Sequence, residues 1–175
     1  FAPGEISGVV KGPDGTTPLE GILVQSYNPS TGAWGWDWTD SAGQYEIGGL
    51  AAGSYRIRFS DGTGTHAPEI FNNIPGDNIW NYGALIAVAE GATTTGIDAS
   101  LALAGRISGT VTGPDGTMRL EGIYVESYNP AMGRWGPSDY TDANGQYEIG
   151  GLATGSYRIR FSDPSSTYMS EVYYD

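Results

Sequence analysis

The sequence predicts an all-β protein made of two tandem β-sandwich domains, and three observations support this prediction. The chain has 28 glycines and 10 prolines among 175 residues, so turns interrupt it frequently. Aromatic and β-branched residues lie between those turns, which separates the chain from disordered glycine-rich polymers. A domain-sized segment also occurs twice, and no stretch has a convincing helical period.

The internal repeat defines the domain organisation. The segment QYEIGGLAAGSYRIRFSD at 44–61 returns as QYEIGGLATGSYRIRFSD at 146–163, and LEGILVQSYNP at 19–29 returns as LEGIYVESYNP at 120–130. The offset rises from 101 to 102 residues between these segments, which predicts a one-residue insertion near Pro137. Such a period is too long for a solenoid repeat, so we expect domains joined like beads on a string.

The strands of the first copy follow from residue alternation and turn signals. The first, at 5–11, stops at the Pro13-Asp14-Gly15 turn, which is a strong turn signal. Further strands are expected at 21–28, 34–39, 44–47, 54–60, 82–89 and 95–103. In 54–60 the alternation is clearest, with Tyr55, Ile57 and Phe59 pointing inward. About seven strands in roughly 100 residues make a two-sheet sandwich the simplest closed arrangement.

The two expected domains are 1–104 and 105–175, and the second lacks its C-terminal strands. It reaches Asp175, which aligns with Asn73, so it has no counterpart of 76–104. An open edge and a partly exposed core would be costly. Three explanations stay open: the chain is part of a longer multi-repeat protein, a neighbouring chain supplies the strand, or the second copy is a smaller closed sandwich.

The two ends of the chain are candidates for contacts between repeats. Phe1, Ala2 and Pro3 align with the end of the first copy, so they resemble the tail of a preceding repeat. Tyr173 and Tyr174 lie at the opposite end, beside the expected open edge. We expect these five residues to take part in strand exchange or inter-repeat contact.

Charge and composition exclude several classes of function. The net charge of −12 disfavours nucleic acids and anionic membrane surfaces as partners. The chain has no cysteine, hence no disulfide framework and no thiolate site. No apolar run approaches the roughly 18 residues that span a bilayer, so membrane insertion is not expected.

A family resemblance rests on the repeated pattern ISGxVxGPDGTxxLEGIxVxSYNP, followed by TDxxGQYEIGGLxxGSYRIRFSD. It resembles the carboxypeptidase regulatory-like, transthyretin-like modules of secreted bacterial and archaeal proteins, and is similar to the collagen-adhesin B-type repeats of surface stalks. The resemblance implies an Ig-like or transthyretin-like sandwich in an extracellular or cell-surface protein. It implies a non-catalytic stalk, spacer or filament role, with neighbouring repeats or identical subunits as partners.

Catalysis is not expected. The only histidine, His66, lies in a Gly/Thr loop without a partner carboxylate at motif spacing, and the second copy has Tyr168 there. No GxSxG, HExxH or P-loop pattern occurs. The regulatory-like module of the resemblance is separate from any zinc-binding peptidase domain.

Carbohydrate binding is the alternative function. Trp34, Trp36 and Trp38 occupy alternate positions and would share one face of a strand. Indoles on one face can stack on sugar rings, and Asp37 could accept hydrogen bonds from hydroxyls. The competing interpretation is that the rings cover the sandwich or pack on another domain. The second copy keeps only Trp135, which weakens a shared polysaccharide-binding role.

Calcium is the one cofactor that the sequence brings into consideration. Asp142 and Asn144 resemble the start of an oxygen-ligand loop, and Asp40 is the counterpart in the first copy. The remaining ligands of an EF-hand loop are absent. A turn in which the aspartates accept backbone hydrogen bonds is the simpler interpretation, so no cofactor is expected.

Overall fold

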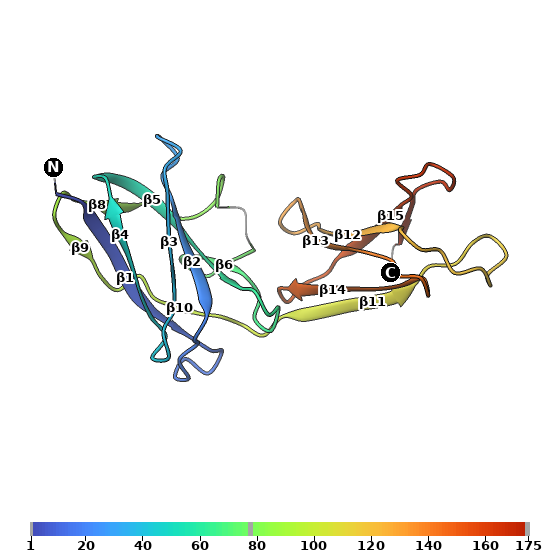
Figure 1. Ribbon diagram of the computed structural model, residues 1–175, viewed down its shortest axis with the longest axis horizontal. Helices are drawn as coiled ribbons and strands as arrows, with labels where there is room; N and C mark the ends of the chain where they lie inside the picture. Colours follow the sequence, from blue (N-terminus) through green and yellow to red (C-terminus); the bar gives the residue numbers. More distant parts are fainter. Residues whose placement is uncertain (1, 77–78, 174–175) are drawn as a thin grey trace. The chain divides into compact units, whose positions relative to one another are not determined.

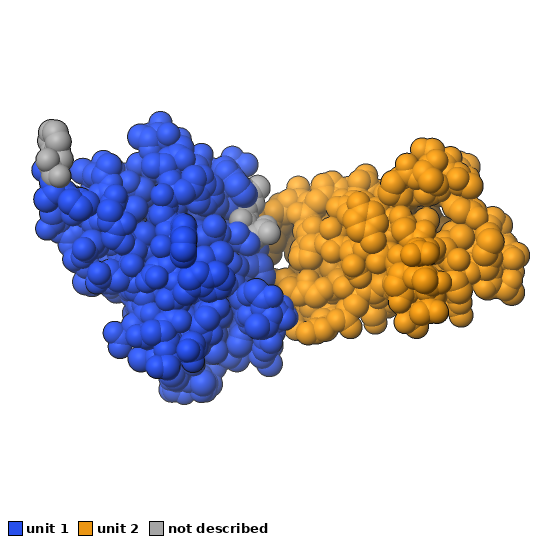
Figure 2. All heavy atoms as spheres, in the orientation of Figure 1, with its two compact units in different colours: residues 1–103 blue, residues 104–175 orange. Residues whose placement is uncertain are grey.

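A computed structural model of the chain describes residues 2–76 and 79–173. The described residues form strands and turns and include no helix, which confirms the all-β prediction (Figure 1). The chain divides into two compact units, Phe1–Leu103 and Ala104–Asp175, called unit 1 and unit 2 below (Figure 2). No helix among the described residues is long and apolar enough to cross a membrane.

Unit 1 consists of two sheets packed face to face. The first sheet contains β1 (Gly4–Lys11), β4 (Gln44–Leu50), β9 (Thr93–Thr94) and β10 (Ala99–Ser100). The second sheet contains β2 (Ile22–Tyr27), β3 (Trp34–Trp38), β5 (Gly53–Asp61), β6 (Glu69–Ile70), β7 (Ile74–Pro75) and β8 (Ile86–Val88). β1 is antiparallel to β4 but parallel to β9 and β10, so the first sheet is mixed.

The core of unit 1 lies between these sheets and follows the predicted alternation. Tyr55, Ile57 and Phe59 of β5 are at most 1% exposed, as predicted. Ile6 and Val10 of β1 meet them from the other sheet and are fully buried. Burying side chains of this size from both sheets is the main favourable term in the stability of the unit.

The last two expected strands of unit 1 are shorter than predicted. Within 82–89 the structure has only β8, and within 95–103 only β10, while β9 lies just before that range. The intervening residues run along the edge of β1 through individual hydrogen bonds rather than a continuous ladder. In this way Ile97, Ala99 and Leu101 enter the core while the backbone between them bends.

Unit 2 repeats the central strands of unit 1. One sheet contains β11 (Gly105–Thr110) and β14 (Gln146–Leu152). The other contains β12 (Tyr124–Asn129), β13 (Arg134–Tyr140), β15 (Arg158–Ser162) and β16 (Glu171–Tyr173). In the described part of unit 2, β11 pairs with β14 alone, so its other edge is open.

The predicted insertion near Pro137 appears as a β-bulge. Tyr128 pairs with Trp135 and Glu126 pairs with Ser138, so two residues of β13 lie opposite Ser127 alone. The hydroxyl of Ser127 donates a hydrogen bond to the carbonyl of Pro137 at 2.8 Å. The extra residue is absorbed within the strand pair, and the later strands keep their register.

The core of unit 2 is less completely enclosed. Val125, Ile149 and Ile159 are buried, which matches the first copy. Tyr157 and Phe161 pack against this cluster but are only half-buried, although the counterparts of all these residues in unit 1 are buried. β15 is also shorter than β5, because the first residues of β5 pair with β8 and no described strand does the same for β15.

Candidate functional site

The three tryptophans of β3 share one exposed face, as the alternation predicts. Trp34, Trp36 and Trp38 are 44%, 64% and 49% exposed. The core-facing side of β3 has no room for such a ring. At Gly35, which faces the core, even an added Cβ would lie 2.8 Å from Ile47 Cγ2. The outer face of β3 therefore carries a row of indoles on the edge of the second sheet.

Part of this aromatic row is already engaged within unit 1. The Trp34 ring lies 4.7 Å from that of Tyr27 and 5.6 Å, edge-on, from that of Trp80. The guanidinium of Arg56 donates hydrogen bonds to the carbonyls of Ile79 and Trp80, which holds the loop that carries Trp80. Trp34 thus has a packing role, while Trp36 remains the most exposed ring.

Unit 2 replaces the aromatic row by a mixed aromatic and charged cluster. Trp135 packs on Tyr128 with 5.1 Å between ring centroids, and the Arg160 guanidinium lies 4.3 Å from the Trp135 centroid. Arg160 also forms an ion pair with the buried carboxylate of Glu126. Tyr140, at the position of Trp38, contacts Tyr124 at 5.0 Å. The cation–π contact between Arg160 and Trp135 holds the Trp135 ring in place.

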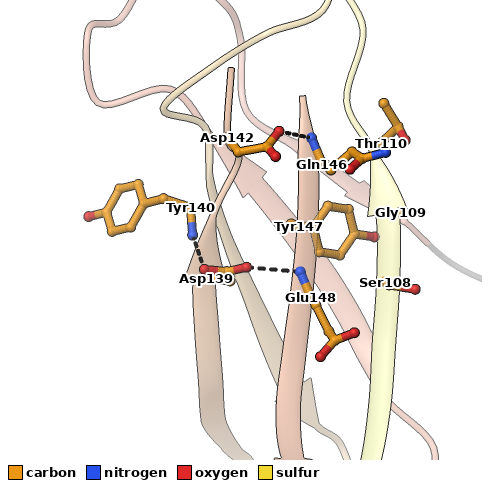
Figure 3. Close-up of a pocket in the computed structure, with 9 residues that line it drawn as sticks. All are labelled: Ser108, Gly109, Thr110, Asp139, Tyr140, Asp142, Gln146, Tyr147 and Glu148. Carbon is orange, nitrogen blue, oxygen red and sulfur yellow. Dashed lines mark hydrogen bonds between the residues drawn. The ribbon is translucent and has the colours of Figure 1, made fainter. Parts of the chain in front are cut away.

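Asp37 lies on the opposite side of β3 from the indoles. Its Oδ2 accepts a hydrogen bond from the backbone N–H of Glu46 in β4 at 2.8 Å. In unit 2, Asp139 accepts the same bond from Glu148 at 2.8 Å (Figure 3). Each aspartate joins the edges of the two sheets, so the structure does not bring Asp37 together with the tryptophans, and the carboxylate is not available to hydroxyls on the indole face.

The candidate calcium residues organise a turn. Asp142 Oδ1 accepts hydrogen bonds from the N–H groups of Asn144 and Gln146 at 2.8 and 2.9 Å. Asp40 does the same in unit 1 for Ala42 and Gln44 at 2.8 and 2.9 Å. The backbone of Asn144 is thus a donor to the carboxylate. Within residues 2–76 and 79–173, no group of three or more His, Asp or Glu side chains is arranged to hold a metal ion.

The turn borders a hollow, and each unit has its own copy of this hollow. In unit 2 it measures about 620 Å³ and its lining includes Asp139, Asp142, Tyr147 and Glu148 (Figure 3). Unit 1 has a hollow of about 610 Å³ at the corresponding residues, where Thr95, Gly96 and Asp98 form an additional wall. The difference between the two hollows is therefore the segment that runs beside β1.

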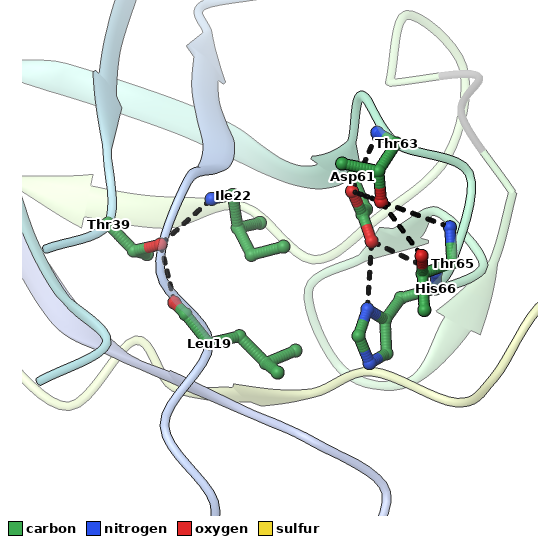
Figure 4. Close-up of polar contacts among 7 residues, drawn as sticks. All are labelled: Leu19, Ile22, Thr39, Asp61, Thr63, Thr65 and His66. Atoms are coloured by element: carbon green, nitrogen blue, oxygen red, sulfur yellow. Dashed lines mark hydrogen bonds and ion pairs between the residues drawn. The ribbon is translucent and has the colours of Figure 1, made fainter. Parts of the chain in front are cut away.

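His66 does have a carboxylate partner, contrary to the sequence-based expectation. Its Nδ1 lies 2.8 Å from Asp61 Oδ2, and Asp61 also accepts hydrogen bonds from Thr63 (Figure 4). The same oxygen accepts from the backbone N–H of His66, so the pair closes the loop after β5. Asp163 closes the equivalent loop in unit 2 through Tyr168 N–H without a histidine. The closure of this loop thus accounts for the His66–Asp61 pair without a catalytic role.

The residues expected at inter-repeat contacts lie in different settings. Ala2 is tied within unit 1, because its N–H donates to Glu90 Oε1 at 3.1 Å and its carbonyl accepts from Gly91. Pro3 is exposed. Tyr173 lies in β16, paired with Ile159, and is 57% exposed. Phe1 and Tyr174 lie outside the described residues.

One segment of the chain, in unit 1, matches a known family model. The family model described as the carboxypeptidase regulatory-like domain matches residues 5–80, from β1 to beyond β7. No curated protein sequence matches the chain.

Solved structures that resemble this chain include two pilins and the Bacillus anthracis TIE protein. The Streptococcal ancillary pilin has a TM-score of 0.43 and 12% identity over 100% of this chain and 60% of its own. GBS52, the minor pilin of Streptococcus agalactiae, has 0.39 and 16% over 97% and 89%. The Bacillus anthracis TIE protein has 0.38 and 18% over 98% and 31%, so the present chain spans about a third of it.

The structure also contains interactions that the sequence did not predict. The hydroxyl of Tyr45 donates to the carbonyl of Ile97 at 2.6 Å, which ties the first sheet to the segment beside β1. Burial and the charge of Asp98 raise the pKa of Tyr45. The Arg160–Trp135 contact was missed too, although the outward arginines of the repeated strand and Glu126 in place of Gln25 were visible signals.

Proposed function

We propose that the chain is a non-catalytic, extracellular structural module that serves as a stalk, spacer or surface-fibre subunit. The observation that carries this proposal is the direction of two neighbouring segments in unit 1. β1, which begins the unit, runs parallel to β9 and β10, which end it. Tension along the chain would pull β1 toward its start and β10 toward its end, so the bonds between them would be loaded together in shear.

Several contacts would share that load. Glu5 N–H donates to Ala92, Ile97 N–H to Ser7, and Leu101 N–H to Lys11, at 3.0, 3.2 and 2.8 Å. Asp98 Oδ1 adds a side-chain acceptor for Val9 N–H at 2.8 Å. Hydrogen bonds loaded in shear must break together, whereas those at a peeled edge break one at a time. A module with this geometry suits a protein that holds a position under force.

The motif residues support the same function. In both units the aspartates and glycines of the repeated pattern form turns or contacts between sheet edges. Asp40 accepts hydrogen bonds within a turn, and Asp37 accepts one from the edge strand β4. The net charge of −12 keeps such a surface soluble. Placement at the cell surface can be checked by antibody labelling of intact cells of the source organism, and labelling only after lysis would contradict it.

Force spectroscopy on the full chain tests the mechanical role. We expect a distinct unfolding peak for unit 1 with a contour-length gain of roughly 30–35 nm, because Phe1–Leu103 unravels at about 3.4 Å per residue. Asp98→Ala should lower the force of this peak, because it removes one bond of the sheared set. The control Asp14→Ala, in a turn away from that set, should leave the force unchanged. Extension without a peak would refute the proposal.

Carbohydrate binding is the second candidate, and the exposure of Trp36 and Trp38 on one face favours it. Isothermal titration of the full chain against a panel of soluble polysaccharides tests it. Binding should be lost in Trp36→Ala and retained in the control Met169→Ala, which changes a residue that is 95% exposed in the other unit. No heat of binding at millimolar sugar would reject this candidate.

A further inference from the structure

β3 is an edge strand of the second sheet of unit 1. It pairs with β2 on one side, and no residue within 2–76 or 79–173 pairs with it on the other. Its three tryptophans are exposed, and its remaining two residues are half-buried. A strand in the middle of a complete unit thus presents a free edge.

The hydrogen bonds at the two ends of β3 show which of its backbone groups face this edge. Ala33, just before the strand, accepts from Asn28 N–H, and Thr39, just after it, donates to the Ile22 carbonyl. In an antiparallel pair such bonds recur at every second residue. The odd-numbered residues of β3 therefore bond to β2, and the backbone N–H and C=O groups of the three tryptophans point to the free edge.

β3 lacks the features that usually block an exposed edge. Native proteins protect such edges with proline, lysine or a bulge, among other devices. β13, the equivalent strand of unit 2, contains Pro137 and a bulge opposite Ser127. β3 contains no proline or lysine, and its five residues pair with β2 without a shift in register. The edge of β3 is therefore open to strand addition.

The exposed face of β3 has the same residues in both chain directions. Its sequence WGWDW carries tryptophan at the first, third and fifth positions. A two-fold axis at Trp36 would place Trp36 opposite its own copy and Trp34 opposite Trp38 of the second copy. These residues have their backbone groups at the free edge, so N–H groups would meet carbonyls in this register. The edge is thus self-complementary, as a two-fold interface requires.

The core-facing side of β3 fits the same register. Asp37 would lie opposite Gly35 of the second copy, which has no side chain. The two Asp37 carboxylates would therefore not be directly opposed, an arrangement that destabilises paired strands. Each carboxylate is also held within its own unit by the N–H of Glu46 at 2.8 Å.

We propose that the free edge of β3 is a self-association site, where two copies of the chain pair through antiparallel β3 strands. The occupant is a second copy of this chain. The pairing joins the second sheets of the two copies into one continuous sheet, with the tryptophans of both on one face. This inference goes beyond the proposed function, because lateral pairing of chains does not follow from resistance to tension along one chain.

Indole packing favours this association, and net charge opposes it. Directly opposite residues of a hydrogen-bonded pair have Cα atoms about 5.5 Å apart, close enough for the two Trp36 rings to pack on each other. Each copy has a net charge of −12, and salt screens the repulsion between copies. The association constant should therefore rise with salt concentration, whereas it would fall for an interface built on ion pairs.

Sedimentation equilibrium of the full chain over a concentration series tests the proposal. We expect a monomer–dimer equilibrium that shifts toward dimer as NaCl is added. Trp36→Pro should lower the association constant at least about tenfold, because each dimer loses two backbone hydrogen bonds. This proline leaves the bonds between β3 and β2 intact, since the Trp36 N–H points away from β2.

Two further variants separate backbone pairing from other effects. Trp36→Ala keeps the N–H and should associate more strongly than Trp36→Pro. Trp135→Ala is the matched control, because it removes an exposed indole from the equivalent strand of unit 2 and should leave the association constant unchanged. Circular dichroism and the melting temperature establish that each variant is folded.

Cysteine cross-linking tests the register, since the chain has no cysteine of its own. Trp36→Cys places its sulfur opposite that of the second copy, with Cα atoms about 5.5 Å apart, which a disulfide can span. Trp38→Cys is the matched control on the same face. Its two copies are offset by four residues, or about 13 Å along the strand. Mild oxidation should therefore link Trp36→Cys into a covalent dimer at least about tenfold faster than Trp38→Cys, because only the first pair lies within reach of a disulfide.

Any of four results would overturn the proposal. The first is a chain that sediments as a monomer at every concentration and salt, including one that binds a polysaccharide through Trp36, which would make sugar the occupant of this face. The second is a dimer that Trp36→Pro leaves intact. The third is equal weakening by Trp36→Ala and Trp36→Pro, which would mean that indoles alone make the contact. The last is equal cross-linking of the two cysteine variants, which would exclude the two-fold register at Trp36.

Discussion

Thr39, the first residue of the repeated TDxxGQY pattern, illustrates how single side chains hold each unit together. It is buried, its hydroxyl accepts from Ile22 N–H at 2.9 Å, and it donates to the Leu19 carbonyl at 2.6 Å (Figure 4). Thr141 makes the same two bonds in unit 2. A hydroxyl is required because one atom must both accept and donate.

Replacing Thr39 by valine should therefore destabilise unit 1. Valine has the same shape but leaves Ile22 N–H without its buried acceptor, which costs about 1–3 kcal/mol. Urea denaturation measures the change, and Thr141→Val should have the same effect on unit 2. The control Thr31→Val, in an exposed loop, should change stability by less than about 0.5 kcal/mol. An equally small effect of Thr39→Val would contradict this role.

The lowered pKa of Asp61 predicts how the stability of unit 1 depends on pH. Burial alone would raise its pKa, but hydrogen bonds from Thr63 and His66 outweigh burial and lower the pKa below its usual value. Because the folded pKa is depressed, the contribution of Asp61 is complete above the unfolded pKa of about 3.9. It is lost as pH falls through the lower folded pKa.

Wild-type chain should thus lose more stability than Asp61→Asn on acidification below about pH 4. Denaturation curves at a series of pH values measure the difference between the two chains. Hydrogen bonds, that from Ser165 first, lower the pKa of Asp163 in unit 2 as well, so Asp163→Asn is a second test. Parallel pH profiles for wild type and Asp61→Asn would show that the loop does not depend on this carboxylate.

At the scale of elements, the tight turn between β3 and β4 is constrained both by its backbone conformation and by its neighbours. Gly43 has φ +73°, and an added Cβ would lie 2.4 Å from the carbonyl oxygen of Val10. Gly145 repeats this geometry, with 2.6 Å to the carbonyl oxygen of Val111. The turn needs glycine both for its left-handed conformation and for its contact with the neighbouring strand.

Gly43→Ala should cost more than the conformational penalty of about 1–2 kcal/mol for a left-handed alanine. Gly15→Ala is the matched control, because Gly15 has φ +68° but nothing within 4 Å of an added Cβ. The difference between the two free energies of unfolding isolates the steric term. Equal losses in both variants would mean that the backbone relaxes without cost at Gly43.

At the scale of the whole molecule, the two units have the same repeated strands but differ in how completely their cores are covered. Unit 1 closes its core with Ile86, Val88 and the segment at 93–103. In the described part of unit 2, the corresponding side of the core is half-exposed. Exposed apolar area reduces the gain from folding, so unit 2 should be the less stable.

Calorimetry of the full chain should accordingly show two transitions, with unit 2 unfolding first. Val24 and Val125 occupy equivalent positions and are both fully buried. Val24→Ala should lower only the upper transition and Val125→Ala only the lower, each by about 2 kcal/mol in stability. A single transition that both variants shift would show that the units unfold cooperatively.

Much of the fold could be predicted because its signals are local. Alternation along 54–60 predicted which side chains of β5 are buried, and the offset between copies predicted the extra residue near Pro137 that the structure accommodates as a bulge. The contacts of Asp37 with Glu46 and of Tyr45 with Ile97 could not be predicted. Both join residues that only the packing of two sheets brings together, and neither leaves a periodic signal.

The amino-acid sequence alone determined that this protein is a duplicated all-β chain with turns at Asp–Gly motifs. It also determined which residues of the clearest strand face inward. These properties depend on residues that are neighbours in the sequence. Only the tertiary structure decided that residues 93–103 run parallel to β1 and that β11 lacks such a partner among the described residues. Strand order and direction depend on contacts between residues distant in sequence.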